Sequence, residues 1–220
     1  MKKVTILLAA TLVLACSSTD PAALLGHPVW GYPSIPTAAV LQAPQNDLGL
    51  LLYREPRSRK AVENFYTALT GNREISLAIL RYADANEIPL PLAFALAWGE
   101  SAFNPRAYNR NAQSVDRGLF QLNSSTFPSL KVEQFYDPQI NARFGLEHLR
   151  FCLDQAGSEL VALAIYNAGV VKVRRGTPYS TLNHIARILA YRDALKKDFQ
   201  LLLEGSPLLD HLASRIASSP

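Results

Sequence analysis

The sequence predicts a mainly α-helical protein. From residue 72 onward, apolar residues recur at the three- and four-residue spacing of an amphipathic helix. Residues 89–100 are apolar almost all round, which is typical of a buried helix. A long amphipathic stretch covers residues 181–203, whereas strand signals are limited to a possible hairpin around residues 110–122. These patterns favour a helical domain with one buried central helix.

The first predicted element is a lead-in helix within residues 47–70. One side of it carries the apolar residues Val62, Phe65, Tyr66 and Leu69. A second helix follows Asn72, whose side chain can cap its first turn. Its buried face is expected to hold Ile75, Ile79, Leu80, Tyr82 and Ala83. Pro89 and Pro91 suit the first turn of the central helix over residues 89–100.

Residues 102–117 are polar and are expected to form a loop. A short element is predicted near residues 124–130, followed by helices at about 138–156 and 158–168. The last predicted helix spans residues 181–203. Its buried face is expected to hold Ile185, Ile188, Leu189, Leu195 and Phe199.

The composition is that of a globular protein. The chain has 220 residues, 49% of them hydrophobic and 18% charged, which excludes a disordered chain and allows one well-packed domain with appendages. The formal net charge is +4, and it falls to +2 if Lys2 and Lys3 are removed in processing. So small a surplus gives no reason to expect nucleic-acid binding, although anionic cell-wall polymers remain possible partners.

Residues 1–15 are predicted to be a signal peptide. A basic start is followed by a twelve-residue apolar run over residues 4–15, which is too short to span a bilayer as a helix. The run ends in Val13-Leu14-Ala15-Cys16, which resembles the lipobox of bacterial lipoproteins. The resemblance implies that Cys16 carries lipid and anchors the protein to a membrane of the bacterial envelope, facing the periplasm. Ser17 is compatible with the outer membrane. The alternative is ordinary secretion with cleavage near Ala15.

Residues 16–70 are expected to combine the lipidated Cys16, an extended tether and the lead-in helix. The tether is predicted over residues 17–46, which hold five of the fourteen prolines and one charged residue. Lipidation of Cys16 would leave Cys152 without a disulfide partner, and Cys152 lies in an apolar helical pattern typical of a small core residue. Residues 204–220 are expected to be a C-terminal tail.

Glu100 is the most informative single residue. It is the only charged residue in the segment 89–100 and stands at its C-terminal end, where the helix dipole disfavours a carboxylate. Burial and the dipole both favour the protonated carboxyl, which a general acid needs. The alternative is an exposed glutamate on a fraying helix end.

Three motifs follow one another along the chain. They are Glu100-Ser101, then Gly118-Leu119-Phe120-Gln121, then Tyr166-Asn167-Ala168-Gly169. In this order and near this spacing they resemble the soluble lytic transglycosylase family of the lysozyme-like superfold, over roughly residues 72–195. The resemblance implies a lysozyme-like catalytic domain with a long substrate cleft at residues 71–203.

The resemblance also implies an activity. Such an enzyme cleaves the MurNAc-GlcNAc β-1,4 glycosidic bond of peptidoglycan and forms 1,6-anhydro-MurNAc ends, with Glu100 as acid and base. Ser101, Gln121, Tyr166 and Asn167 would bind or border the glycan strand. Gln121 could instead be a structural buried amide, and Tyr166 a core aromatic. We expect no cofactor, and we expect the protein to be a monomer. The four histidines are scattered singly, so no metal site is expected either.

The sequence departs from the family pattern in two places. Val115-Asp116 replaces the usual glycine-alanine pair, and His184 stands where the family usually has a tyrosine. Asp116 matches the second carboxylate of C-type lysozymes, which opens a hydrolytic route. It could instead be a loop residue that bonds to nearby backbone. A hydrolytic muramidase and a non-catalytic glycan-binding lipoprotein therefore remain as alternatives.

Overall fold

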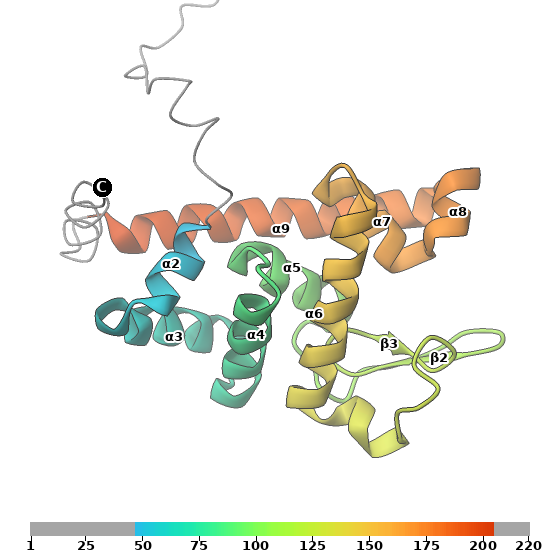
Figure 1. The fold of residues 1–220 in the computed structure, drawn as a ribbon, viewed down its shortest axis with the longest axis horizontal. Coiled ribbons are helices and arrows are strands. Elements are labelled where there is room, and N and C mark those ends of the chain that lie inside the picture. The colour runs from blue at the N-terminus through green and yellow to red at the C-terminus, as the bar shows by residue number, and fades with distance from the viewer. Residues whose placement is uncertain (1–46, 205–220) are drawn as a thin grey trace, which may run out of the picture. The chain divides into compact units, whose positions relative to one another are not determined.

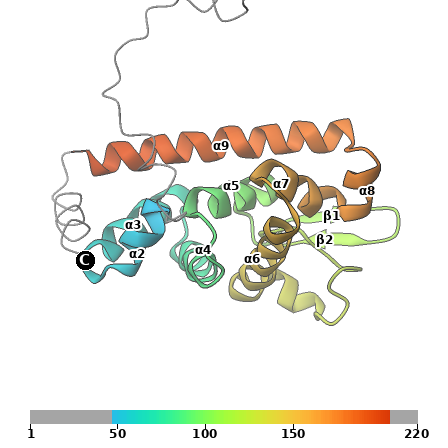
Figure 2. The same ribbon diagram turned by 45° about the horizontal axis from the view of Figure 1, so that its top comes forward.

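The computed structural model describes residues 47–204, and the prediction of a mainly α-helical protein is confirmed. The predicted signal peptide, the Cys16 anchor, the tether and the tail from residue 205 onward lie outside the described residues. The long helix α9 (Tyr179–Leu203) lies lengthwise against α5 (Leu90–Ser101) and α7 (Glu159–Ala168), as Figures 1 and 2 show. The other helices are α2 (Leu48–Arg54), α3 (Pro56–Thr70), α4 (Arg73–Ala85), α6 (Pro138–Gln155) and α8 (Val170–Arg175).

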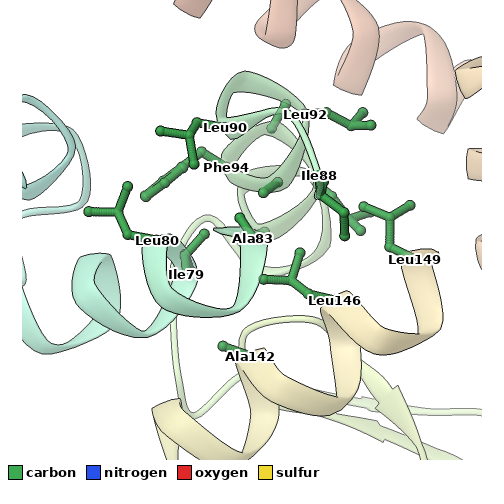
Figure 3. Close-up of a cluster of buried hydrophobic side chains, with 14 of the residues drawn as sticks. Ile79, Leu80, Ala83, Ile88, Leu90, Leu92, Phe94, Ala142, Leu146 and Leu149 are labelled. Carbon is green, nitrogen blue, oxygen red and sulfur yellow. The ribbon is translucent and has the colours of Figure 1, made fainter. Parts of the chain in front are cut away.

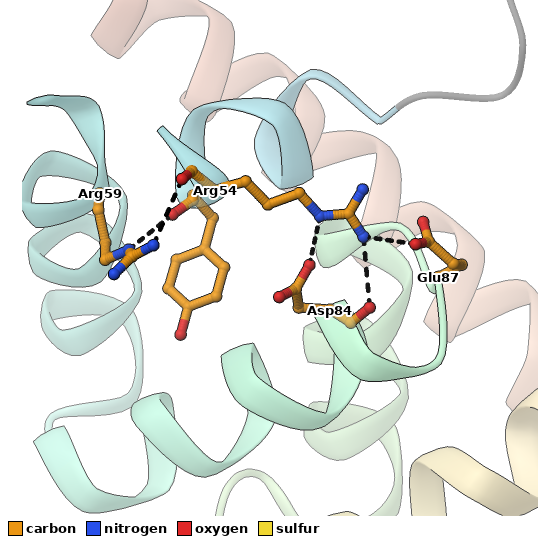
Figure 4. A network of polar contacts seen from close by, with 5 residues as sticks. Arg54, Arg59, Asp84 and Glu87 are labelled. Carbon is orange, nitrogen blue, oxygen red and sulfur yellow. Dashed lines mark hydrogen bonds and ion pairs between the residues drawn. The ribbon is translucent and has the colours of Figure 1, made fainter. Parts of the chain in front are cut away.

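The lead-in segment forms two helices rather than the single one predicted. The chain breaks at Glu55, which has extended backbone angles (φ −78°, ψ 122°), and Pro56 begins α3. Proline disfavours helical angles in the residue before it and suits the first helical position, so the break follows from the sequence. Arg54 then bonds to the carboxylates of Asp84 (2.5 Å) and Glu87 (2.7 Å), which ties α2 to the end of α4 (Figure 4).

Asp47 connects the start of the described chain to the central helix. Its carboxylate accepts hydrogen bonds from the backbone N–H of Gly49, in the first turn of α2, and of Leu90, at the start of α5. Burial raises the pKa of Asp47, and the two backbone donors act in the opposite direction. One side chain therefore caps two helices that start 42 residues apart.

Helix α5 is the buried centre of the domain. Every residue from Leu90 to Ala97 is buried, as expected for a helix that is apolar all round. Figure 3 shows the side of the core where α4, the start of α5 and α6 meet. The labelled side chains there are Ile79, Leu80, Ala83, Ile88, Leu90, Leu92, Phe94, Ala142, Leu146 and Leu149. The helix ends at Ala102, which adopts a left-handed conformation, so Glu100 lies in the last turn.

Helix α9 packs directly against α5 at Gly99. A Cβ atom on Gly99 would lie 2.4 Å from Cγ1 of Ile188, closer than two carbon atoms can pack. Ile188 is itself buried, so it has little room to move away. The absence of a side chain on Gly99 therefore sets how near α9 can come to the last turn of α5.

The polar segment after α5 contains more sheet than the predicted hairpin. Strands β1 (Tyr108–Arg110), β2 (Val115–Arg117) and β3 (Leu122–Asn123) form an antiparallel sheet in that order. The prediction of a short element near residues 124–130 was wrong. That segment is a series of turns, in which the carbonyl of Asn123 accepts from two following backbone N–H groups. A short 3₁₀ helix, η2 (Val132–Tyr136), follows instead.

Helices α6, α7 and α9 begin and end within two residues of their predicted positions. Helix α8 was not predicted. The positions expected on the buried face of α9 are all buried or partly buried against the core. Cys152 is buried, as predicted for a small core residue, and within residues 47–204 its thiol is free. Within residues 47–204, no helix is both long and apolar enough to cross a membrane.

Asp47→Ala is expected to destabilise the domain. It removes the acceptor for two backbone N–H groups, and a lost helix cap costs about 1–2 kcal/mol. Urea denaturation followed by circular dichroism would measure the change. Asp47→Asn keeps one acceptor oxygen and should lose less. Equal stability of Asp47→Ala and the wild type would contradict the capping role.

Candidate functional site

A cavity of about 680 Å³ opens beside the last turn of α5. Two kinds of side chain form its walls. They are polar residues on or beside the sheet, Asn109, Asn111, Asp116 and Asn123, and aromatic residues on or near α6, Phe127, His148 and Phe151. Glu100 lines the same cavity. The long cleft expected from the sequence resemblance stays a prediction.

Glu100 is largely buried in this cavity, with 11% of its side chain exposed. Its Oε1 atom lies 3.0 Å from Nε2 of His184, in the second turn of α9. The two residues are 84 positions apart, and the close approach at Gly99 brings their helices together. His184 was noted in the sequence only as a departure from the family pattern. The structure makes it the hydrogen-bonding partner of the one charge on α5.

Ser101 follows Glu100 but does not line the cavity. Its hydroxyl donates to the carbonyl of Leu119 (2.8 Å) and also lies 3.1 Å from the carbonyl of Ala97. Ser101 thus joins the end of α5 to the Gly118–Gln121 turn. The structure places it behind the cavity wall, where it holds the backbone.

The turn at residues 118–121 requires its glycine. Gly118 has a φ of +80°, and a Cβ atom there would lie 2.2 Å from the carbonyl oxygen of Phe135. Gln121 also has a positive φ (+46°), which is costly for a residue with a side chain. Its side-chain amide donates to the carbonyl of Gly118 (3.0 Å), and the residue lines the cavity. The turn is held in a strained shape at the site.

Asn141 supports this turn, and the sequence analysis missed it. It is 1% exposed, and its Oδ1 accepts from the N–H of Phe120 (2.8 Å). Its Nδ2 donates to the carbonyls of Arg117 (3.0 Å) and Phe135 (2.7 Å). A polar residue on the otherwise apolar stripe of α6 was the signal that could have revealed it.

Asp116 lies on β2 and also lines the cavity. Its carboxylate accepts from the side-chain amides of Asn123 (2.7 Å), Asn111 (2.8 Å) and, more weakly, Asn109 (3.4 Å). The alternative of a loop residue bonded to nearby backbone is therefore not what the structure shows. The carboxylate is held by side-chain amides of β1, of β3 and of Asn111, which directly follows β1.

Tyr166 and Asn167, at the end of α7, border the cavity. The Tyr166 hydroxyl donates to the carbonyl of Phe120 (2.9 Å). Burial, and then the nearby charge of Glu100, raise the pKa of Tyr166 well above its ordinary value, so the hydroxyl stays protonated. The exposed Asn167 accepts from the hydroxyl of Thr181 at 2.8 Å.

Five of the six candidate residues thus line one cavity: Glu100, Asp116, Gln121, Tyr166 and Asn167. A buried carboxyl among amide groups can exchange a proton with a substrate that the amides hold, as glycosidic bond cleavage requires. Among residues 47–204, no cluster of three or more His, Cys, Asp or Glu side chains could hold a metal ion.

The chain is similar to proteins of known family. Residues 78–186 match the family described as the transglycosylase SLT domain. The chain is 32% identical over 105 residues to the soluble lytic murein transglycosylases of Escherichia coli strain K12 and of Escherichia coli O157:H7. The match covers 43% of this chain and 16% of each relative. No solved structure gives a significant match.

Proposed function

Because the chain belongs to the transglycosylase SLT domain family, we propose that it is a lytic transglycosylase of peptidoglycan. The substrate bond is the β-1,4 link between MurNAc and GlcNAc. The observation that carries the proposal is Glu100, a carboxyl that is 11% exposed and faces a cavity lined by amides. The relatives are murein transglycosylases by name, but this chain matches only 16% of their length, so Glu100 and its cavity are the main support for the activity.

Glu100 supplies both proton transfers. The protonated carboxyl donates its proton to the glycosidic oxygen, and the bond from that oxygen to the anomeric carbon of MurNAc breaks. The resulting carboxylate then takes the proton from the 6-hydroxyl of the same MurNAc, whose oxygen attacks the anomeric carbon. The products are a GlcNAc with a free 4-hydroxyl and a 1,6-anhydro-MurNAc end, and no water is consumed.

The polar wall of the cavity suits the sugar. Hydroxyl and N-acetyl groups pair well with amides, which both donate and accept hydrogen bonds. We propose that Asn167, Gln121 and the amides around Asp116 contact the glycan strand. Ser101 and Tyr166 bond instead to the carbonyls of Leu119 and Phe120. Their proposed part is to hold the turn that carries Gln121.

His184 is the proposed positioning residue for Glu100. It is 21% exposed and 3.0 Å from the carboxyl oxygen, so it restricts where the proton donor points. A fixed position of the Glu100 carboxyl matters because a general acid must lie within hydrogen-bonding distance of the atom it protonates.

The proposed setting is the cell envelope. Lipid on Cys16 would anchor the protein to a membrane, facing the periplasm and on the outer membrane, and residues 17–46 would let a monomeric domain reach the wall. The resemblance of Val13-Leu14-Ala15-Cys16 to a lipobox supports this arrangement.

Glu100→Gln should abolish turnover while the fold and glycan binding persist, because the amide cannot donate a proton in the way a carboxyl does. The expected loss is at least about 10²-fold, the lower end of what general acid–base catalysis contributes. Mass spectrometry of soluble products from purified peptidoglycan measures it. Substantial cleavage by a well-folded Glu100→Gln protein would show that Glu100 is not the general acid.

Asp116→Asn separates the transglycosylase from the hydrolytic alternative. A lytic transglycosylase needs only Glu100, so the variant should lose about tenfold, or 1.4 kcal/mol of barrier, through a loosened sheet. A lysozyme-like route would lose its second carboxylate and several kcal/mol. The mass of the wild-type products also distinguishes the two routes, because an anhydro end is one water lighter than a reducing end. Reducing ends together with a loss as large as that of Glu100→Gln would favour the muramidase.

His184→Ala should lower kcat by about tenfold with little change in KM, since it frees the Glu100 side chain without removing a sugar contact. His184→Tyr, the residue usual in the family, should restore much of the rate with an altered pH profile. The pH dependence of kcat for the three proteins tests the role. If His184→Tyr were as slow as His184→Ala, or if both kept the wild-type profile, positioning of Glu100 would be the wrong explanation.

Cys16→Ser should move the protein from the membrane fraction to the soluble fraction, because it removes the site of lipidation. Catalytic activity of the purified variant serves as the control for folding. Continued membrane association after a high-salt wash would argue against the lipid anchor.

A further inference from the structure

We infer that Thr181 is a positioning residue for Asn167, and that it makes the Asn167 side chain a hydrogen-bond donor toward the glycan strand. This rests on the proposed function, in which Asn167 contacts the sugar. It goes further, because it gives a task to Thr181, which lies in none of the three motifs, and because it fixes the kind of substrate atom that Asn167 can bind.

The hydroxyl of Thr181 is buried at the start of α9. The residue is 4% exposed and lies in the first turn of the helix, three residues after the N-cap Pro178. The backbone N–H groups of a first helical turn lack partners within the helix, but they are donors and cannot accept a hydroxyl proton. Within residues 47–204, the acceptor of that proton is Oδ1 of Asn167, at 2.8 Å.

This contact decides which end of the Asn167 amide faces the cavity. An asparagine side chain has one accepting atom and one donating atom, so an Oδ1 that accepts from Thr181 leaves Nδ2 directed away from the hydroxyl. Asn167 is exposed and lines the cavity, and in the described part of the chain its Nδ2 has no hydrogen-bonding partner. The N–H bonds of Nδ2 are therefore available to a substrate atom.

The matching group on the substrate is an oxygen that accepts hydrogen bonds. Glycan strands carry such oxygens in their acetamido, hydroxyl and ether groups. An amide that was free to turn would offer either end, and half of its orientations would present Oδ1, which cannot bond to a carbonyl or ether oxygen. By holding Oδ1, Thr181 removes this ambiguity before the sugar arrives.

Thr181 and His184 act from the same side of α9. They are three residues apart, so their side chains are neighbours on the helix surface. Thr181 bonds to Asn167 near the end of α7, whereas His184 bonds to the carboxyl in the last turn of α5. Because Glu100 transfers protons and Asn167 does not, we expect the two contacts to affect different kinetic constants, kcat for His184 and KM for Thr181.

Thr181→Val tests the inference, since valine has nearly the shape of threonine but no hydroxyl. KM for soluble peptidoglycan strands should rise about fivefold with kcat nearly unchanged, because the freed amide loses part of a hydrogen bond to the sugar. Thr181→Ser keeps the hydroxyl and should restore the wild-type KM. Ser180→Ala removes an exposed hydroxyl from the same turn and is the matched control. Circular dichroism during urea denaturation checks that each variant is folded.

A double-mutant cycle distinguishes positioning from a general structural role. In a protein that already carries Asn167→Ala, the amide that Thr181 orients is absent. Adding Thr181→Val to this protein should then change KM by less than about twofold, whereas independent effects would multiply.

Several results would overturn the inference while the activity stands. They are an unchanged KM for Thr181→Val, a fall in kcat in place of the rise in KM, no rescue by Thr181→Ser, and a full effect of Thr181→Val on top of Asn167→Ala. If Thr181→Val did not fold, Asn167→Asp would decide. Its carboxylate can still accept from Thr181 but has no N–H, so its KM should rise, and a wild-type KM would contradict the inference. A folded wild type that cleaves no strands would instead overturn the proposed function, and the inference with it.

Discussion

The contact between α5 and α9 at Gly99 is the constraint on which the site depends. Because Gly99 has no side chain, Ile188 of α9 packs directly against α5. His184 lies one turn before Ile188 on α9, and this packing brings it to Glu100. Close packing of this kind has little tolerance, because a displaced helix cannot keep both a buried apolar contact and a 3.0 Å hydrogen bond. The core contact and the polar contact therefore support each other.

A second set of interactions fixes the turn at residues 118–121, which carries Gln121 on the cavity wall. Ser101, Asn141 and Tyr166, from three different helices, all bond to backbone groups of Leu119 or Phe120. The turn has one backbone bond of its own, from the N–H of Gln121 to the carbonyl of Gly118, and side chains from the surrounding helices satisfy backbone groups of the two residues between them. The left-handed conformations of Gly118 and Gln121 are kept by this support. Ser101 and Tyr166, which the sequence motifs suggest as substrate contacts, thus bond to the backbone of this turn.

Much of the fold was predictable because its periodic signals are strong. The apolar segment 89–100 became the buried helix α5, and Asn72 caps α4 as expected, with its side chain accepting from Ile75. The errors lie where local pattern is weak. The residue before Pro56 interrupts the lead-in helix, and residues 124–130 form turns whose bonds come from Asn123. Such segments are too short for the spacing of apolar residues to distinguish a helix from a turn.

The sequence by itself determined the helical class, the family resemblance and Glu100 as the candidate acid, because hydropathy and ordered motifs are properties of the linear chain. Only the tertiary structure decided the partners of each group. His184 reaches Glu100 across 84 positions, Asn141 supports a turn from another helix, and Ser101 faces backbone rather than the cavity. Hydrogen bonds depend on distance and direction in space, and those are set by how the helices pack, which no local pattern in the sequence records.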